Sequence, residues 1–345
     1  MRFGSDQLTG SDSDVVVLAW TRISARQEDL AHQLSGQLEL VYPDHRLAKN
    51  SVARYLLSAK QTISFLRRGS YEVLIVTAPP VEAALICAVF RRRRKPILLD
   101  SHPGAFGLTG DVHSAKLQTV HRWLWRQAAC VLVTTPQLAR TVQAGGGAAL
   151  VFHEPPARWQ EDKPASILGD VRASVGSRRV CVPFVFQRDE PVEVLIAAAI
   201  LLPDVEFRVT GNPERLPKEI EIPANLTLVG FLDSERFLKE MSDADVVLVL
   251  STEPQSVMRT AYEAIRLGRP LVVSETEATL EYFRYALHTE NSGLAVSRAI
   301  RTLLEEATGA SLRRTRSATE ASERITKDQM EELRERIARA SGRGR

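Results

Sequence analysis

The feature that most constrains the fold is a repeated alternation of short apolar runs with longer segments of helical periodicity. The strands expected in the first half are 14–20, 38–42, 72–77, 96–100, 130–134 and 149–153. The helices expected between them are 24–34, 52–66, 81–90 and 114–127, followed by a short helix before residue 149. Strands that alternate with helices form parallel sheets whose faces the helices cover. The pattern therefore predicts an α/β fold.

The alternation is interrupted once and then restarts. Residues 155–176 contain several prolines and glycines and few apolar side chains, which indicates a linker. Beyond it we expect strands at 180–186, 206–210, 226–229, 245–250 and 270–274, and helices at 192–202, 234–241, 257–267 and 297–306. A length of 345 residues suits two domains rather than one.

We therefore expect two Rossmann-like domains, an N-terminal one over 1–165 and a C-terminal one over 166–310. A charged helix and basic tail follow at 311–345. Ligands of open α/β sheets bind beyond the carboxyl ends of the strands, so two such domains place two ligand sites at a central cleft. That arrangement suits a reaction between two bound molecules.

Composition excludes several classes of protein. The net charge of +3 is too small for a dedicated nucleic-acid binder. The cysteines Cys87, Cys130 and Cys181 are far apart in apolar stretches and match neither a zinc site nor a disulfide framework, so we expect buried thiols. No apolar run reaches the length of a membrane span and the first residues are polar, which predicts a cytoplasmic protein.

The segment 243–275 carries the most specific motif. It combines a strand, Ser251, a loop, a helix containing Glu263 and a Gly-Arg-Pro sequence that opens the next strand. In this order it resembles the donor-binding segment of the retaining family-4 and related GT-B glycosyltransferases. The resemblance implies that Glu263 binds the ribose of a nucleotide-sugar, and that the helix start near Met258 and Arg259 faces the diphosphate.

The motif departs from the family pattern at its first glutamate, whose position is taken by Gln255. A glutamine keeps a hydrogen-bonding carbonyl but loses the negative charge. The glycines usual in this loop are replaced by Ser256 and Met258, so the phosphate loop is less open.

Two further segments resemble strand ends that flank the nucleobase in the family. They are 208–212, with Gly211 and Asn212, and 228–232, with Gly230 and Phe231. Residues 186–199 resemble the first strand–helix unit of such domains. There Arg188 takes the position of the diphosphate-binding arginine, whereas the lysine often present is absent and Asp189 and Glu190 stand in its region.

In the first half, 98–106 and 149–159 resemble loops of GT-B enzymes that add sugars to lipid-linked or polysaccharide acceptors. Asp100 and His102 end an expected strand, where a carboxylate or an imidazole can contact the sugar or deprotonate an acceptor hydroxyl. Each also has an ordinary structural reading, as a hydrogen-bonded side chain. Together with Arg188, these two residues are the catalytic candidates.

No metal cluster is evident, because the histidines are scattered and the two aspartates of 243–245 precede a strand, where they cap a turn. A retaining enzyme also needs no strong base, since the departing diphosphate can accept the acceptor's proton. We expect a metal-independent reaction without a cofactor, in which the nucleotide-sugar is a substrate.

The densest cationic run is 90–95 (FRRRRK), at the end of an expected helix. It is either a solvated helix end, favoured by the helix dipole, or a contact with anionic lipid or a phosphorylated acceptor through Arg91–Lys95. Trp123 and Trp125 extend this region, but two residues at this spacing cannot share one helix face, so one of them belongs to the core.

The sequence thus predicts a transferase of the hexosyltransferase type that moves a sugar from a nucleotide-sugar to a glycan, glycolipid or polysaccharide precursor, in the cytoplasm or at the inner face of the membrane. Two alternatives stay open. A GT-B-like protein that binds without catalysis agrees with Gln255 and the missing lysine. A nucleotide-sugar epimerase agrees with the architecture, although acid and base candidates are few.

Overall fold

The structure is a computed structural model that describes residues 14–43, 50–68, 70–91, 95–106, 115–159, 178–216, 219–306 and 308–342. The described chain divides into two compact units. The first unit contains the residues up to Arg158 together with Gln329–Gly342. The second runs from Trp159 to Asp328.

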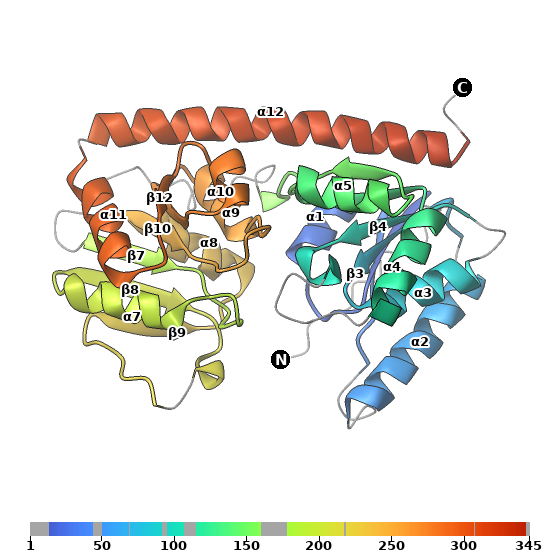
Figure 1. Ribbon diagram of the computed structural model, residues 1–345, viewed down its shortest axis with the longest axis horizontal. Helices are drawn as coiled ribbons and strands as arrows, with labels where there is room; N and C mark the ends of the chain where they lie inside the picture. Colours follow the sequence, from blue (N-terminus) through green and yellow to red (C-terminus); the bar gives the residue numbers. More distant parts are fainter. Residues whose placement is uncertain are drawn as a thin grey trace. The chain divides into compact units, whose positions relative to one another are not determined.

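The first unit is built on a six-stranded parallel sheet in the order β2-β1-β3-β4-β5-β6 (Figure 1). Its strands are β1 (Val15–Ala19), β2 (Gln37–Leu40), β3 (Val73–Ala78), β4 (Ile97–Ser101), β5 (Cys130–Val133) and β6 (Ala149–Val151). Four of them, β1 and β3 to β5, consist mainly of aliphatic residues and are buried on both faces. Such runs are typical of the inner strands of parallel sheets.

Helices cover both faces of this sheet. Leu66 of α2 (Ser51–Arg68), Cys87 of α3 (Val81–Phe90), Trp125 of α4 (Ala115–Gln127) and Val142 of α5 (Pro136–Ala144) enter one core cluster. Leu30 of α1 (Ala25–Gln33) enters the cluster on the opposite face. The alternation of strand side chains divides these clusters, with Val16 and Leu18 on one side and Val15 and Val17 on the other.

The second unit repeats the plan with the order β12-β11-β10-β7-β8-β9. Its strands are β7 (Arg178–Val182), β8 (Val205–Thr210), β9 (Leu226–Gly230), β10 (Val246–Val249), β11 (Leu271–Ser274) and β12 (Leu287–Thr289). The helices α7 (Val192–Leu201) and α11 (Gly293–Glu305) pack on one face, and α8 (Ser234–Ser242) and α9 (Arg259–Arg266) pack on the other. A short helix, α10 (Glu277–Tyr282), follows β11.

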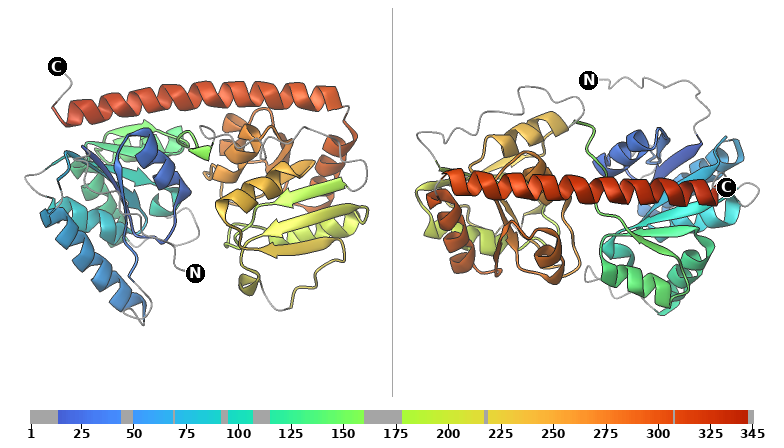
Figure 2. Two further views of the ribbon diagram at one scale, coloured as in Figure 1. Left: turned by 180° about the vertical axis from the view of Figure 1, so that it is seen from behind. Right: turned by 90° about the horizontal axis from the view of Figure 1, so that it is seen from above.

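The last helix, α12 (Thr308–Ala340), is one continuous helix that belongs to both units (Figure 2). In the second unit Ala318 joins the core beside α9, and Thr319 Oγ1 donates to the carbonyl of Ile265 at 2.8 Å. In the first unit Met330 and Leu333 join the core cluster that contains α1. The charged helix expected over 311–345 is present, and its buried residues complete the cores of both units.

Several expectations agree with the described structure. The expected helix 81–90 has the same bounds as α3, the three cysteines are free and buried, and of the two tryptophans Trp125 is core while Trp123 is exposed. The strand expected over 180–186 stops at Val182, because Pro183 has no N–H to continue the ladder. The chain passes between the units at Arg158–Trp159, whereas 160–176 of the expected linker and the boundary at 165 lie outside the described residues. Among the described helices, none is long and apolar enough to cross a bilayer.

Candidate functional site

The loop between β10 and α9 lies at the carboxyl edge of the second sheet and is tied to its neighbours through Ser251. Ser251 is buried, and its Oγ donates to Asp189 Oδ2 at 2.9 Å, in the loop that follows β7. Its backbone N–H donates to Ser274 Oγ at 2.9 Å, at the end of β11, and its carbonyl accepts from Asn291 Nδ2 at 3.0 Å, after β12. One serine therefore fixes the ends of four adjacent strands together.

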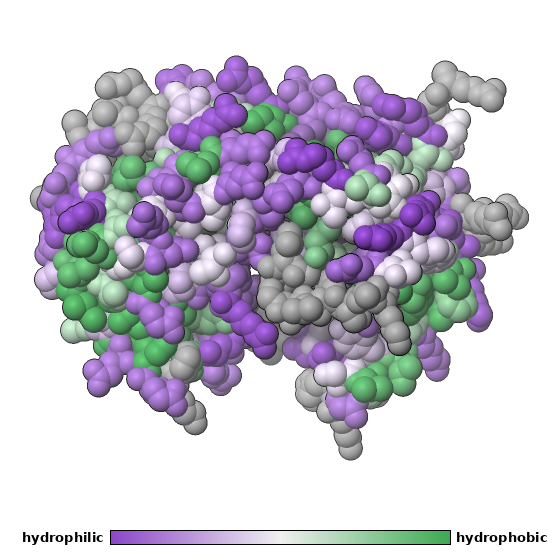
Figure 3. Space-filling model, in the orientation of Figure 1, coloured by the Kyte–Doolittle hydropathy of each residue, from purple (hydrophilic) through white to green (hydrophobic). Residues whose placement is uncertain are grey.

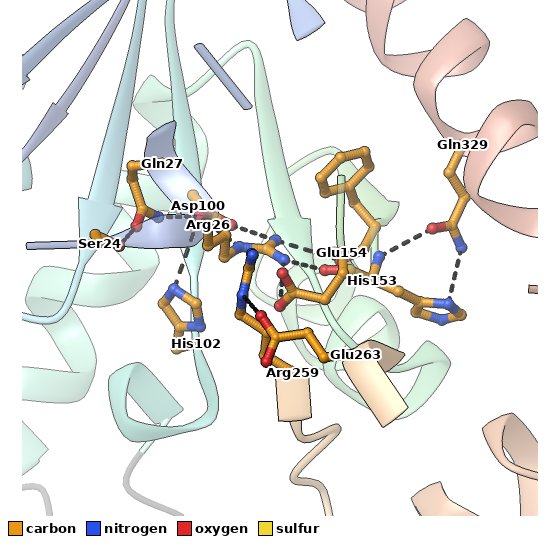
Figure 4. A network of polar contacts seen from close by, with 11 residues as sticks. Ser24, Arg26, Gln27, Asp100, His102, His153, Glu154, Arg259, Glu263 and Gln329 are labelled. Atoms are coloured by element: carbon orange, nitrogen blue, oxygen red, sulfur yellow. Dashed lines mark hydrogen bonds and ion pairs between the residues drawn. The ribbon is translucent and has the colours of Figure 1, made fainter. Parts of the chain in front are cut away.

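Arg259 and Glu263 form an ion pair on the first turns of α9 (Figure 4). Arg259 Nε lies 2.9 Å from Glu263 Oε1, and the Glu263 side chain is only 8% exposed. The helix begins at Arg259 after Met258, whose side chain makes no cap hydrogen bond. A cation at the first position of a helix is unfavourable to the helix dipole, so the buried carboxylate of Glu263 compensates the charge of Arg259.

Gln255 is buried in the same loop. Its Nε2 donates to Glu277 Oε2 at 3.3 Å, and its backbone N–H approaches Glu253 Oε1 at 3.4 Å. Glu253 is also buried, and burial, together with the nearby Asp189 carboxylate, raises its pKa. The position of the family's first glutamate is thus occupied by the Gln255 amide, which contacts the carboxylate of Glu277.

The loops after β8 and β9 meet through two glycines. Gly211 N–H donates to the carbonyl of Gly230 at 3.0 Å. Gly211 has φ +104°, and a Cβ placed there would lie 2.5 Å from the carbonyl oxygen of Phe184, so the position requires glycine. Next to Gly230, the Phe231 ring is 72% exposed, while Asn212 Oδ1 is used to cap the turn at Glu214.

Arg188 lies in the exposed loop between β7 and α7, whose acidic residues shape the backbone. The Glu190 carboxylate accepts hydrogen bonds from the N–H groups of Val185 and Gln187, and the Asp189 carbonyl accepts from Thr252 N–H at 2.7 Å. These acids stand where the family often has a lysine. They instead hold the loop that presents Arg188.

In the first unit, Arg26 is the centre of a buried polar cluster (Figure 4). Its Nε lies 3.0 Å from Asp100 Oδ2 and its Nη2 2.9 Å from Asp100 Oδ1, while Nη1 lies 3.0 Å from Glu154 Oε1. Gln27 Nε2 adds a hydrogen bond to Asp100 Oδ2 at 2.8 Å. The cluster joins α1, the end of β4 and the loop after β6 at the carboxyl edge of the sheet.

Asp100 is therefore held as a structural carboxylate. Burial alone would raise its pKa, but the charges of Arg26 and His102 and the hydrogen bonds from Arg26 and Gln27 lower it instead. Both of its oxygens accept hydrogen bonds from Arg26, and Oδ2 also accepts one from Gln27. This geometry suits a carboxylate that orients its neighbours better than one that takes a proton from a substrate.

His102 follows β4 and borders this cluster. Its Nε2 lies 3.7 Å from Asp100 Oδ2, and its side chain is 35% exposed. Burial lowers the pKa of His102 and the charge of Arg26 lowers it further, whereas Asp100 and Glu154 oppose the shift. The ring is neutral at neutral pH and can accept a proton.

His153 is a second imidazole at this edge, and sequence reasoning did not select it. Its Nδ1 lies 3.3 Å from Gln329 Nε2, and its backbone N–H donates to Gln329 Oε1 at 2.9 Å. Because an amide nitrogen only donates, Nδ1 accepts and the ring is neutral. Burial and the charge of Arg26 lower the pKa of His153 to about 3.

The comparisons with known proteins bear on the fold. No family model and no curated protein matches the sequence. Sucrose-phosphate synthase from Thermosynechococcus elongatus matches with a TM-score of 0.69 and 17% identity over 94% of this chain and 99% of its own. HepE of Anabaena, solved with UDP and glucose, matches with a TM-score of 0.65 and 14% identity over 93% of this chain and 99% of its own.

The chain has the GT-B fold. A putative UDP-N-acetylglucosamine 2-epimerase from Listeria monocytogenes shares the GT-B fold at a TM-score of 0.55 and 12% identity over 87% of this chain and 90% of its own. The GT-B fold therefore accommodates more than one reaction of nucleotide-sugars.

Within this GT-B fold the expected donor residues gather at the carboxyl edge of the second sheet. Ser251, Gln255, Met258, Arg259 and Glu263 share one loop and helix start, while Gly211, Asn212, Gly230 and Phe231 follow β8 and β9 and Arg188 follows β7. Asp100 and His102 lie at the corresponding edge of the first sheet. Sequence reasoning named Asp189 without giving it a role and did not select Ser274 and Asn291, whose position at the ends of β11 and β12 was the available signal.

Proposed function

We propose that this protein is a glycosyltransferase that moves a sugar from a nucleoside diphosphate sugar to a glycan, glycolipid or polysaccharide precursor. The observation that carries the proposal is the buried carboxylate of Glu263 on α9, beside the loop that Ser251 ties to the neighbouring strand ends. A buried carboxylate one turn inside a helix start can accept both ribose hydroxyls while the helix start meets the diphosphate.

The remaining donor residues fit this assignment. At Gly230 the space that a Cβ would occupy is open, which allows a flat base to approach the backbone, and Phe231 offers an exposed ring beside it. Arg188 and Arg259 supply positive charge for the diphosphate, which makes a metal-independent reaction our proposal. HepE was solved with UDP and with UDP-glucose, which supports UDP as the first donor nucleotide to test.

Transfer with retention breaks the bond from the anomeric carbon to the diphosphate oxygen and forms a bond from that carbon to the acceptor hydroxyl on the same face of the sugar. The acceptor's proton passes to the departing diphosphate oxygen, whose negative charge Arg188, Arg259 and the α9 start stabilise. His102, neutral and partly exposed, contacts the acceptor hydroxyl or the sugar, and Arg26 and Asp100 hold it in place.

The test is a transfer assay with UDP-sugars and oligosaccharide or lipid-linked acceptors, run with and without EDTA. His102→Ala is expected to abolish turnover and to leave UDP binding intact, while Glu263→Ala removes UDP binding. Unchanged turnover in His102→Ala removes His102 from the mechanism. Absence of any UDP-dependent thermal stabilisation, about 2.7 kcal/mol at 100 times the dissociation constant, counts against a UDP-sugar donor.

Two observations favour a second candidate, binding of a nucleotide-sugar without transfer. The Gln255 amide contacts Glu277, and the family lysine is replaced by loop-forming acids. A protein of this kind would bind UDP-sugar and leave it intact. Quantifying free sugar and UDP after long incubation separates this candidate from a transferase and from an epimerase, which releases an isomerised sugar without an acceptor.

For the cationic run Arg91–Lys95 we keep contact with an anionic membrane as a proposal. Arg91 Nη1 donates to the carbonyl of Gln127 at 3.1 Å, and Lys95 Nζ lies 3.2 Å from Glu72 Oε1, while Arg92–Arg94 lie outside the described residues. The two described members of the run therefore make contacts within the first unit.

A further inference from the structure

A surface of the first unit combines exposed aliphatic side chains with unopposed positive charge. It is formed by the outer faces of α2, α3 and α4, where α3 contacts both of its neighbours. Val52 and Leu56 on α2 are 69% and 67% exposed. The other large apolar side chains exposed on these helices are Tyr55, Leu85, Val89, Phe90 and Trp123. Figure 3 shows apolar residues gathered over the outer ends of α2 and α3.

These side chains are exposed because the opposite face of each helix forms the core. On α3, Ala83, Ala84 and Cys87 are buried against the sheet, so Leu85 and Val89 point away from it. Polar residues at positions 85 and 89 would leave the core of the first unit unchanged, so burial in the core does not explain the apolar side chains there. An exposed apolar stripe of this kind marks an interaction site more often than a free surface.

The charge on the same helices is mainly positive. Across α2, α3 and α4 the sequence has Arg54, Lys60, Arg67, Arg68, Lys116, Arg122 and Arg126, and its only acidic residue is Glu82. Lys60, Arg67 and Arg122 are exposed, and within the described residues no carboxylate lies at ion-pair distance from them. Aliphatic side chains beside solvated cations are what an anionic lipid surface recognises, since the former enter the acyl boundary and the latter meet the headgroups.

We propose that this surface, made by Val52, Leu56, Lys60, Arg67, Leu85 and Val89, docks the first unit onto an anionic lipid bilayer. The proposal rests on the proposed function only for the lipid-linked class of acceptor. The three exposed aromatic side chains, Tyr55, Phe90 and Trp123, lie on three different helices and form no shared stacking platform. This favours lipid over a nucleic acid, whose bases are bound by stacking on rings. A second copy of this chain would carry the same positive charge and would be repelled.

The experiment is co-sedimentation of the full chain with vesicles of phosphatidylcholine alone or with 30 mol% phosphatidylglycerol, about the fraction needed for a clearly anionic surface. Wild-type protein should bind the anionic vesicles and be released by salt. Lys60→Gln and Arg67→Gln should each lower the partition coefficient about fivefold, the worth of one basic residue near the surface. The double variant Leu56→Asp, Val89→Asp should lower it about tenfold or more, because both apolar contacts are lost.

The matched control is Ile200→Asp, Leu201→Asp on α7 of the second unit, where the two residues are 63% and 50% exposed. It removes the same amount of exposed apolar surface beside Asp204 and should leave vesicle binding unchanged. The proposal is overturned if the α2–α3 variants bind vesicles as well as wild type does. It is also overturned if wild type forms a dimer that the Leu56→Asp, Val89→Asp variant does not form, or if wild type binds nucleic acid in preference to vesicles.

The same variants are also assayed for UDP binding and for transfer to a water-soluble acceptor. Both should match wild type, because the substituted side chains lie on helix faces that point away from the sheet. If wild type binds vesicles but neither binds nor uses UDP-sugars, the proposed function fails and the lipid surface stands. If wild type transfers sugar but does not bind vesicles, the lipid surface fails and the proposed function stands.

Discussion

Arg26 holds both carboxylate oxygens of Asp100, with Nε 3.0 Å from Oδ2 and Nη2 2.9 Å from Oδ1, and both side chains are buried. The same guanidinium reaches Glu154 and the carbonyl of His153, so one side chain fastens α1 to β4 and to the loop after β6. Its removal leaves two buried carboxylates without their cation.

Arg26→Ala should therefore lower the free energy of unfolding by about 3 to 5 kcal/mol, the cost of breaking a buried ion pair by removing one partner. Urea denaturation measures the change. Arg54→Ala, at a less buried arginine of α2, is the control and should cost less than about 1 kcal/mol. If Arg26→Ala lowers the free energy of unfolding as little as Arg54→Ala does, the buried ion pairs of Arg26 do not stabilise the fold.

The pH dependence of stability should report His153. Burial lowers the pKa of this imidazole to about 3, whereas in the unfolded chain it lies near 6.5. Between these values the unfolded state binds a proton that the folded state does not, so the free energy of unfolding falls as pH falls, by up to about 1.4 kcal/mol per pH unit. The shift of His102 acts in the same direction.

Denaturation of wild type and His153→Gln at intervals from pH 7 to pH 5 tests this, above the range in which most carboxylates titrate. The variant should show a shallower slope, by about one proton's worth below pH 6.5. The slope, not the stability at one pH, is the readout, because the substitution also disturbs the hydrogen bonds to Gln329. Parallel curves for the two proteins would show that His153 takes up its proton at the same pH in the folded and the unfolded state.

Gly211 should tolerate substitution less well than Gly230, although both have positive φ. At Gly211 a Cβ would lie 2.5 Å from the carbonyl oxygen of Phe184, whereas at Gly230 no heavy atom lies within 4 Å. Gly230→Ala should cost about 1 kcal/mol of backbone strain, and Gly211→Ala about 1 to 3 kcal/mol more. Chemical denaturation of the two variants measures the difference in their free energies of unfolding. Equal losses of stability would show that the contact with the Phe184 carbonyl costs nothing at Gly211.

Arg259 and Glu263 should separate in their effects on ligand affinity. Under the proposed function Glu263→Gln weakens uridine and UDP alike, because it acts on the ribose. Arg259→Ala weakens UDP by about tenfold or more and uridine much less, because a charge-assisted hydrogen bond to the diphosphate is lost. Calorimetric titration with both ligands is the measurement, and Lys239→Ala on the exposed face of α8 is the control. Equal losses for uridine and UDP in Arg259→Ala would place Arg259 away from the diphosphate.

The three thiols should be inert while the protein is folded. Burial raises the pKa of Cys130 to about 11 and raises those of Cys87 and Cys181 further, so thiolate is scarce and inaccessible. Reaction with a chromogenic disulfide should be negligible in buffer and reach all three residues in denaturant. Rapid reaction of any thiol in the native protein would show local opening of its strand or helix.

Element order was predictable from the sequence because buried parallel strands are apolar runs and their covering helices are amphipathic. The helix at Ala115–Gln127 and the strand at Cys130–Val133 follow directly from this contrast. The short elements β12 and α10 were missed. Three strand residues, Leu287–Thr289, and a six-residue helix are too short to show a period.

The polar clusters were less predictable, because they depend on which strands become neighbours. Arg26 lies 74 positions from Asp100 and 128 from Glu154, and only the strand order brings the three together. The packing of α12 was hidden for a different reason. Several of its buried positions are Thr315, Ser322 and Thr326, so its inward face does not appear as an apolar stripe.

The shared helix α12 also sets an order of events during synthesis. Met330 and Leu333 complete the core against which α1 packs, yet they are translated long after the sheet of that unit. The N-terminal half therefore leaves the ribosome with an uncovered apolar face, which becomes sealed only when the rest of the polypeptide has been made. Until then the uncovered face makes this half prone to aggregation, while the C-terminal half lacks only the contacts of its own portion of α12.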